Sequence, residues 1–206
     1  MEIILQKGDF TAVEAEALVL FHFEQDDRLL ETTAAVNDAA GSIIGQVIEA
    51  GDFRGEHLEH LLLYSQGSLA TKRILLMGLG RREEFSVHAL REAAAQSLRT
   101  LRDRRQPRAV LPIPFDSKFP LELSDTAEAC VLGGMLGLYQ FTELRTRDLD
   151  NIKDFDSLII LSQKDSKKLA ARVGRAKAMA SGIYLARDLV TLPPNRATPT
   201  ILAERV

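Results

Sequence analysis

The chain has 206 residues, of which 46% are hydrophobic and 27% charged, a composition that is ordinary for a folded domain and excludes wholesale disorder. The formal net charge of -3 excludes a global basic field of the kind that draws proteins onto nucleic acid or anionic membranes. Cys130 is the single cysteine, which excludes an intramolecular disulfide framework and favours a reducing compartment. No basic leader opens the sequence and no apolar stretch approaches the roughly 20 residues of a membrane span, so we expect a cytoplasmic protein.

Short apolar runs alternate with helical patterns along the chain, which predicts an α/β layered fold. Strands are expected where branched and aromatic residues run between turn residues, at 2–5, 17–23, 59–66, 72–79, 108–115 and 157–162. The third and fourth runs are joined by GSLAT, which suits a short hairpin loop, and the sheet should therefore be mixed rather than purely parallel. Prolines at 112 and 114 predict that the fifth strand ends at a sheet edge or exit.

Two helices are predicted in the first half of the chain. Residues 29–51 read as one helix, with Gly51 and Asp52 available to end it. Residues 86–105 form the clearest amphipathic helix, with Ser86 as its N-cap. Its apolar stripe should face the sheet and consists of Val87, Leu90, Ala94, Leu98 and Leu101.

Two more helices are predicted in the second half. Residues 125–141 are apolar nearly all round, which indicates a buried helix, and Asp125 and Glu128 have the spacing of a capping box at its start. Glycines at 133, 134 and 137 would let that helix pack closely. A long helix is expected from Ser166 to about Val190, with an apolar face of Leu169, Val173, Ala176, Ala180, Ile183 and Val190.

The last residues predict the start of another helix. Pro193 and Pro194 must end the preceding one, because proline lacks the amide donor. Thr198 then has the character of an N-cap and Pro199 suits the first helical position. About two turns remain before residue 206, too few to be stable alone. We therefore expect the chain to be part of a longer protein, or to end inside its second unit.

Gly78 and Gly80 follow a predicted strand as Gly-x-Gly, the start of a dinucleotide-binding turn. Glu83 occupies the third glycine position and Glu84 follows it, and two carboxylates would repel a pyrophosphate. We favour a structural strand-to-helix turn over a nucleotide loop.

Histidines and the cysteine give no metal or nucleophile motif. His57 and His60 are three residues apart, whereas zinc peptidases of the H-E-x-x-H type need a spacing of four, so we interpret them as ordinary surface or edge histidines. His22 and His88 stand alone. Cys130 falls in the buried apolar helix, where a thiol usually packs, and no G-x-S-x-G elbow occurs.

Arginines form a dense basic run at the end of the amphipathic helix. A solvated helix end is favoured over a nucleic-acid contact, because cations suit a helix C-terminus and no aromatic partners for base stacking are near. The run comprises Arg99, Arg102, Arg104, Arg105 and Arg108.

Arg187 falls on the apolar stripe of the last long helix, where a hydrophobic residue is due. Two interpretations are open. The arginine either bonds Asp188 or loop carbonyls at the helix end, or it clamps the 193–199 turn against a following domain. We favour the clamp.

These residues resemble a known family, the leucyl (cytosol) aminopeptidases, which are two-metal peptidases with a smaller N-terminal and a larger catalytic domain. The segment ARDLVTLPPNRATPTILAE is similar to the family's domain junction. KRILLMGLGRREEFSVHALREAAA resembles the strand, turn and helix that its N-terminal domains share, and GGMLGLYQF resembles their buried helix. The matching junction residues are Arg187, Asp188, Leu189, Pro194, Asn195, Thr198 and Pro199.

The resemblance implies a macro-domain-like three-layer fold at residues 1–163, with a mixed central sheet flanked by helices. A connecting helix at 164–192 and the first residues of a catalytic domain at 193–206 would follow. The parent protein would remove N-terminal residues from peptides with two divalent ions, manganese, zinc or magnesium, and assemble as a homohexamer. The family's metal ligands, a lysine with several aspartates and a glutamate, match no position here. No catalytic, cofactor-binding or metal-binding residue is therefore assigned, and the chain alone is expected to be inactive.

The resemblance also implies the partners and the alternatives. The catalytic domain and neighbouring subunits would be the partners, peptide substrates would be reached only through the catalytic domain, and the N-terminal domain would shape assembly and access to the active site. A macro-like fold could instead bind an ADP-ribose-type ligand, although the glutamates after Gly80 argue against a phosphate cradle there. Some bacterial relatives bind DNA, and the arginine run is the local feature that could support it.

Overall fold

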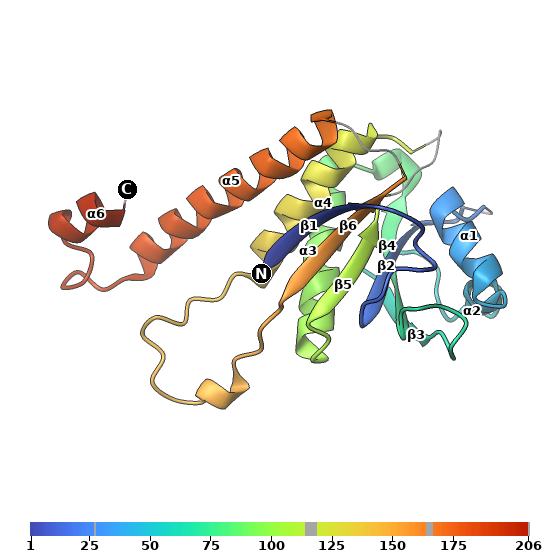
Figure 1. Cartoon of the computed structure of the whole chain (residues 1–206), viewed down its shortest axis with the longest axis horizontal. Coiled ribbons are helices and arrows are strands. Elements are labelled where there is room, and N and C mark those ends of the chain that lie inside the picture. Colours follow the sequence, from blue (N-terminus) through green and yellow to red (C-terminus); the bar gives the residue numbers. More distant parts are fainter. Residues whose placement is uncertain (27, 114–118, 164–166, 206) are drawn as a thin grey trace.

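The computed structural model describes residues 1–26, 28–113, 119–163 and 167–205, and within them six strands form one sheet in the order β1-β6-β5-β2-β4-β3 (Figure 1). β3 runs antiparallel to β4, and every other neighbouring pair is parallel. The mixed sheet is therefore confirmed. The strands are β1 (Glu2–Lys7), β2 (Ala17–Glu24), β3 (His60–Tyr64), β4 (Arg73–Arg81), β5 (Arg108–Pro112) and β6 (Ser157–Ser162).

β5 lies inside the sheet, between β6 and β2, so it is not at an edge, but it ends at Pro112 as the prolines predicted. Pro112 is the last residue of β5 and pairs with Leu161 on β6, whereas β5 pairs with β2 only at Ala109 and Val110. The missing amide of Pro112 therefore removes no hydrogen bond to β2. Residues 114 and 115 of the predicted strand lie outside the described residues.

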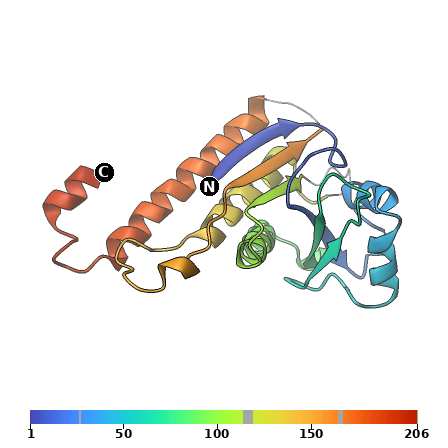
Figure 2. The ribbon, with the colours of Figure 1, turned by 60° about the horizontal axis from the view of Figure 1, so that its bottom comes forward.

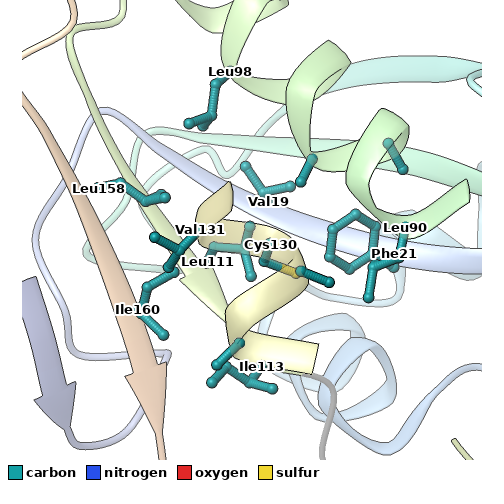
Figure 3. Packing of buried hydrophobic residues seen from close by; sticks show 14 of the residues in the cluster. Val19, Phe21, Leu90, Leu98, Leu111, Ile113, Cys130, Val131, Leu158 and Ile160 are labelled. Atoms are coloured by element: carbon teal, nitrogen blue, oxygen red, sulfur yellow. The ribbon is translucent and has the colours of Figure 1, made fainter. Parts of the chain in front are cut away.

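Side chains of the central strands alternate between two apolar layers, as the two-residue period of a strand requires. On β2, Val19 and Phe21 pack into the larger cluster, toward α3 (Val87–Asp103), α4 (Leu123–Leu138) and α5 (Lys167–Thr191). Leu18 and Leu20 pack on the opposite face, toward α1 (Glu31–Ala39) and α2 (Ile43–Glu49). Figure 3 shows the larger cluster, in which Cys130 of α4 lies among these apolar side chains. The result is a three-layer α/β fold.

The first helical segment is two helices, not the single helix predicted over 29–51. α1 ends at Ala39 and α2 begins at Ile43, because Gly41 (φ 68°) and Ser42 (φ 64°) adopt left-handed backbone conformations. The amide of Ser42 returns to the carbonyl of Asn37 at 2.8 Å, which closes the end of α1. The Asn37 side chain then accepts from the amide of Gly45 at 2.9 Å and joins the two helices.

The N-cap predicted for α3 is confirmed, and the capping box predicted for α4 is wrong. Ser86 Oγ accepts from the amide of Ala89 at 3.1 Å at the start of α3. α4 begins at Leu123, earlier than the capping box placed it, and its N-cap residue Glu122 makes no side-chain cap. Asp125 and Glu128 lie one turn apart and instead face α5.

α4 and α5 are joined by ion pairs. Arg172 of α5 places Nη2 2.9 Å from Asp125 Oδ1 and Nη1 3.0 Å from Glu128 Oε2. Lys168 binds Glu122 one turn earlier. The acidic residues that resembled a capping box thus pair with Arg172 of α5, and Glu128 also lies 3.8 Å from Arg175.

The glycines of α4 allow it to approach α3 at backbone distance, as predicted. A Cβ added at Gly133 would lie 2.3 Å from the carbonyl oxygen of Arg91, and one at Gly137 would lie 2.7 Å from Ala95 Cα. Both distances are far inside van der Waals contact, so no larger side chain fits without a backbone shift.

α5 starts on the sheet and then extends beyond it, and α6 (Pro199–Arg205) follows at its far end (Figures 1 and 2). The apolar face of α5 was predicted to reach Val190, but Ile183 is the last residue of that face that is partly buried. Val190 is 87% exposed. Ser166, the predicted start, lies outside the described residues. Thr198 caps α6, with Oγ1 3.4 Å from the amide of Ile201.

Short 3₁₀ helices, η1 (Arg82–Glu84) and η2 (Leu149–Asn151), lie after β4 and in the loop before β6. Within the described ranges, none of the helices combines the length and the apolar character that crossing a bilayer requires. The amphipathic stripe of α3 is buried from Leu90 to Leu101, while Val87 at its start is 36% exposed.

Candidate functional site

Tyr139, directly after α4, contacts the far half of α5. Its hydroxyl donates to Asp188 Oδ1 at 2.8 Å, and the guanidinium of Arg187 lies over its ring, with Cζ 5.1 Å from the centroid. The ring of Tyr184 lies 5.1 Å from that of Tyr139, and the Tyr184 hydroxyl donates to the carbonyl of Met135. Burial, together with the hydrogen bond to Asp188, raises the pKa of Tyr139, so its hydroxyl remains a donor. This tyrosine cluster, which consists of Tyr139, Tyr184, Arg187 and Asp188, joins the far half of α5 to the end of α4.

A cavity of about 330 Å³ lies beside the tyrosine cluster. It brings together the N-terminus, the end of α3, the loop after α4 and the far half of α5. The described residues that line it include two carboxylates, Asp154 and Asp188, and Asp188 already accepts the hydrogen bond of Tyr139. The lining of the cavity also includes Met1, Arg102, Met135, Tyr139, Phe155 and Tyr184.

The structure separates the predicted junction residues into two groups. Arg187 and Asp188 meet at Tyr139, a contact that the sequence signalled only through the arginine on an apolar stripe. Pro194 and Asn195 are exposed in the turn between α5 and α6, while Thr198 and Pro199 start α6. Arg187 thus contacts Tyr139, which is remote in the chain, and the clamp of the 193–199 turn against a following domain stays a prediction.

The Gly-x-Gly motif packs against a neighbouring loop. A Cβ at Gly78 would lie 2.0 Å from the carbonyl oxygen of Glu56, and the amide of Gly80 donates to the carbonyl of Gly55 at 3.0 Å. The backbone before β3 therefore lies directly on β4 at this point. This close approach explains the glycines without a nucleotide, but both lie within β4 and not in the strand-to-helix turn that the sequence predicted, which begins only at Arg82.

His57 and His88 are far apart in the sequence, but both contact Glu92 in the structure. His57 Nε2 lies 3.2 Å from one carboxylate oxygen of Glu92, and His88 Nε2 lies 3.5 Å from the other. His60 does not join them, since its Nδ1 faces the carbonyl oxygen of Leu58 at 3.1 Å. Across the described residues, no group of three or more His, Cys, Asp or Glu side chains is arranged to hold a metal ion.

The arginine run makes both local and distant contacts. Arg99 donates to Gln96, and Arg102, whose side chain is 14% exposed, pairs with the neighbouring Asp103 at 3.0 Å. Arg108 instead donates to the carbonyl oxygen of Glu14 at 3.4 Å, so the run is only in part a solvated helix end. Cys130 is fully buried, and burial raises the pKa of its thiol far above the usual range, so it is not a reactive thiolate.

A second and larger cavity, of about 650 Å³, lies at the carboxyl end of β2. This edge is where open α/β sheets usually bind ligands. Its walls come from the end of β2, from α2 and from the loop before β3. They include His22, Glu24, Asp26, Ile48, Phe53 and Glu56. Arg82 contacts the end of β2 at two points. It pairs with Asp26 at 2.5 Å, and its Cζ lies 4.2 Å from the centroid of the Phe23 ring.

His22 is the buried titratable group of this cavity. It is 3% exposed, its Nδ1 has no hydrogen-bond partner among the described residues, and its ring lies 6.2 Å from that of Phe53. Burial is the main cause that lowers the pKa of His22 below 6.5; Arg82 acts in the same direction and Asp26 opposes it. His22 is therefore a neutral imidazole at neutral pH.

The lowered pKa of His22 predicts a loss of stability in mild acid. As pH falls through about 6.5, the unfolded chain takes up a proton at His22 that the folded chain does not, so the free energy of unfolding should fall by up to about 1.4 kcal/mol per pH unit. Urea unfolding from pH 7 to 5 should show this slope, and His22→Asn should flatten it. His60→Asn, at an exposed histidine, is the control and should retain the slope. An unchanged slope in His22→Asn would contradict the prediction.

Comparison with known proteins gives one family. The description "Cytosol aminopeptidase family, N-terminal domain" matches residues 17–148. A probable cytosol aminopeptidase of Syntrophobacter fumaroxidans is 33% identical over 205 residues, which cover 99% of this chain and 41% of that protein. The chain thus spans about two-fifths of the length of the curated relatives that it matches.

The fold of this chain resembles that of several solved structures. A tomato leucine aminopeptidase variant superposes with a TM-score of 0.78 at 18% identity, over 99% of this chain and 41% of that one. The bottromycin maturation enzyme BotP in complex with Mn gives 0.68 at 20% identity, over 93% and 35%. The macro domain of ganglioside-induced differentiation-associated protein 2 gives 0.61 at 13% identity, over 85% and 84%. The expected macro-domain-like fold is therefore confirmed.

Proposed function

The chain belongs to the cytosol aminopeptidase family through that family's N-terminal domain, and we propose that it is the non-catalytic part of a metal-dependent aminopeptidase that removes N-terminal residues from peptides. The observation that carries the proposal is the extent of the match, which takes in almost this whole chain and less than half of its relatives. Peptides would be reached only through the catalytic domain, and the whole protein would work in the cytoplasm.

The proposed division of the chain places an N-terminal domain at 1–163, a connecting helix at 164–192 and the first residues of the catalytic domain at 193–206. The course of α5 supports this division, because its far half leaves the sheet and exposes Val190. Leu202 of α6 is also 46% exposed. Apolar side chains in these positions suit a surface that another domain covers. The bond between Tyr139 and Asp188 would set the angle between the two domains.

The metal centre is proposed to belong to the catalytic domain. Aminopeptidases that resemble this chain use two divalent ions, manganese, zinc or magnesium, to activate water and polarise the scissile carbonyl. The donor groups of the described residues do not fit such a centre, since none of them cluster as a metal site would require. The residues of this chain would therefore take no part in the chemical step. Its contribution would be to assembly of a homohexamer and to access to the active site.

The 206-residue chain is expected to show no hydrolysis of a leucine p-nitroanilide in the presence of Mn²⁺, whereas the whole protein that carries it should hydrolyse that substrate. The physical reason is that the metal ligands would all lie in the catalytic domain. Steady-state absorbance assays on both proteins measure this directly. Turnover by the 206-residue chain would refute the division of roles, and an inactive, correctly folded whole protein supplied with Mn²⁺, Zn²⁺ or Mg²⁺ would refute the aminopeptidase assignment.

A further inference from the structure

β3 lies at an edge of the sheet, because within the described part of the chain it pairs with β4 alone. In an antiparallel pair, alternate residues direct both the amide and the carbonyl group toward the neighbouring strand. The carbonyl of Glu59 accepts from the amide of Gly78 at 2.8 Å, and the amide of Ser65 donates to the carbonyl of Lys72 at 3.1 Å. The odd-numbered residues along β3 therefore bond to β4, and the even-numbered residues direct their backbone groups outward.

The outward backbone groups are those of His60, Leu62 and Tyr64. No hydrogen bond to these groups is formed within the described residues. The side chains beside them are also incompletely covered, since Tyr64 is 60% exposed and Leu61 and Leu62, on opposite faces, are half-buried. β3 thus offers free donors and acceptors with apolar side chains on both faces, and such an edge is suited to bind a further strand.

β3 lacks the features by which edge strands usually avoid pairing. Charged residues, above all lysine, together with prolines and bulges serve this purpose. β1, at the opposite edge, has an exposed charged residue at each end, Glu2 and Lys7. The sequence of β3 is HLLLY, and its register with β4 runs from His60 to Tyr64 without a bulge. Of the two edges, β3 is therefore the one suited to pairing.

The outward residues of β3 are complementary to a second copy of themselves. A two-fold axis at Leu62 would place β3 of the second copy antiparallel to this one, with Leu62 opposite Leu62 and His60 opposite Tyr64. Each of these pairs joins residues whose amide and carbonyl groups are both free, so each pair can exchange two hydrogen bonds. A single register therefore gives a partner to every outward group of the strand.

The apolar side chains and the charges also match in this register. Leu62 and its neighbour Leu75 on β4 pack in the larger apolar cluster, and the same two residues of the second copy would continue that row. Ser65, which bonds to Lys72, would lie opposite Glu59 of the second copy. Glu59 and that lysine would then lie on the same face, two strand spacings or about 10 Å apart, so opposite charges flank the pairing at both ends.

We propose that β3 pairs with β3 of a second copy of this chain and joins the two sheets into one continuous sheet. A two-fold contact of this kind closes on itself and gives a dimer. In the whole protein the contact rests on the proposed role of the chain in assembly, but the geometry that carries it belongs to this chain alone. One pair of short strands buries less than the roughly 1,200 Å² of a stable interface, so the isolated chain should dimerise weakly.

Matched charge variants test the register. His60→Glu with Tyr64→Glu would place glutamate opposite glutamate at two positions, whereas His60→Lys with Tyr64→Glu would place lysine opposite glutamate. The two variants differ only at the exposed residue 60, and urea unfolding checks that they are equally stable. Sedimentation equilibrium of the 206-residue chain, up to millimolar concentration, gives each dimer Kd. The lysine variant should have a Kd about tenfold lower, because two cross-strand pairs change from repulsive to attractive.

Amide hydrogen exchange locates the contact on the parent chain, and it decides the matter if both variants unfold. The amides of His60, Leu62 and Tyr64 should exchange more slowly as the protein concentration rises. The amides of Leu61 and Leu63 are the internal control, since they already face β4 and should not respond.

Three results would overturn the proposal. They are a parent chain that stays monomeric at millimolar concentration, equal Kd values for two folded variants, and exchange at Leu62 that does not depend on concentration. An inactive whole protein, in contrast, would refute the aminopeptidase assignment and leave the pairing of β3 unaffected.

Discussion

Replacing Gly133 by alanine is expected to destabilise the chain by about 2 kcal/mol, the balance of about 3 kcal/mol of overpacking against about 1 kcal/mol of gained helix propensity. The added Cβ would lie 2.3 Å from the carbonyl oxygen and 2.7 Å from the Cα of Arg91. Both are backbone atoms of α3, so the clash cannot be relieved by a side-chain rotation. α3 and α4 would have to separate, and the apolar contacts between them would weaken.

A matched substitution on α5 should have the opposite sign. Gly174 has nothing within 4 Å of an added Cβ, so Gly174→Ala gains helix propensity without a clash and should stabilise the chain by about 0.5–1 kcal/mol. Urea-unfolding midpoints of the two variants and the parent chain measure the difference. Two variants that shift the midpoint in the same direction would show that the close approach of α3 and α4 does not govern the effect.

Replacing Phe23 by alanine is expected to cost about 4 kcal/mol, within the range for a fully buried phenylalanine. Phe23 is 0% exposed and packs edge-to-face on Phe85 at 5.3 Å, beside Phe119 at 6.0 Å. Arg82 lies over the same ring and holds Asp26, so the truncation also loosens the wall of the larger cavity. A loss of this size is a large part of the roughly 5–15 kcal/mol that keeps a domain folded.

Phe23→Leu keeps the prediction measurable if the alanine variant does not fold, and it should lose less stability because it leaves a smaller cavity. Tyr64→Ala on β3 is the aromatic control. Tyr64 is 60% exposed, and its loss should cost less than about 1 kcal/mol. Thermal or urea unfolding should therefore rank the variants in the order Tyr64→Ala, Phe23→Leu, Phe23→Ala. A different order would place the aromatic cluster outside the stabilising core.

Local sequence patterns were sufficient to predict the strands, most of the helices and several of their ends. Each predicted strand is present, because branched and aromatic side chains pack well on the pleated, half-buried surface of a sheet. Ser86 and Thr198 cap α3 and α6 as predicted, since a cap is a bond between near neighbours in the chain. The glycines of α4 signalled close packing before the partner helix was known.

Predictions were wrong where the same local pattern is compatible with more than one structure. Asp125 and Glu128 have the spacing of a capping box, yet that same spacing places both carboxylates on the face of α4 that meets Arg172. The periodicity of 29–51 continues through Gly41, although two left-handed residues break the helix there. Val190 continues the apolar period of α5, but the sheet ends before it. In each case the spacing was visible in the sequence, but the contact partner was not.

At the candidate sites, too, single residues were noticeable in the sequence but their partners were not. Arg187 was noticeable in the sequence as a charge on an apolar stripe, whereas Tyr139, its partner, carried no signal of its own. His22 appeared as an isolated histidine, and its cavity exists only because the end of β2, α2 and the loop before β3 meet. The sequence by itself determined the strands, the mixed α/β class, most helices and the family resemblance, because these rest on periodicity and on near neighbours. Only the tertiary structure decided which charges pair, where α5 leaves the sheet and which side chains share a cavity, because those depend on contacts between residues far apart in the chain.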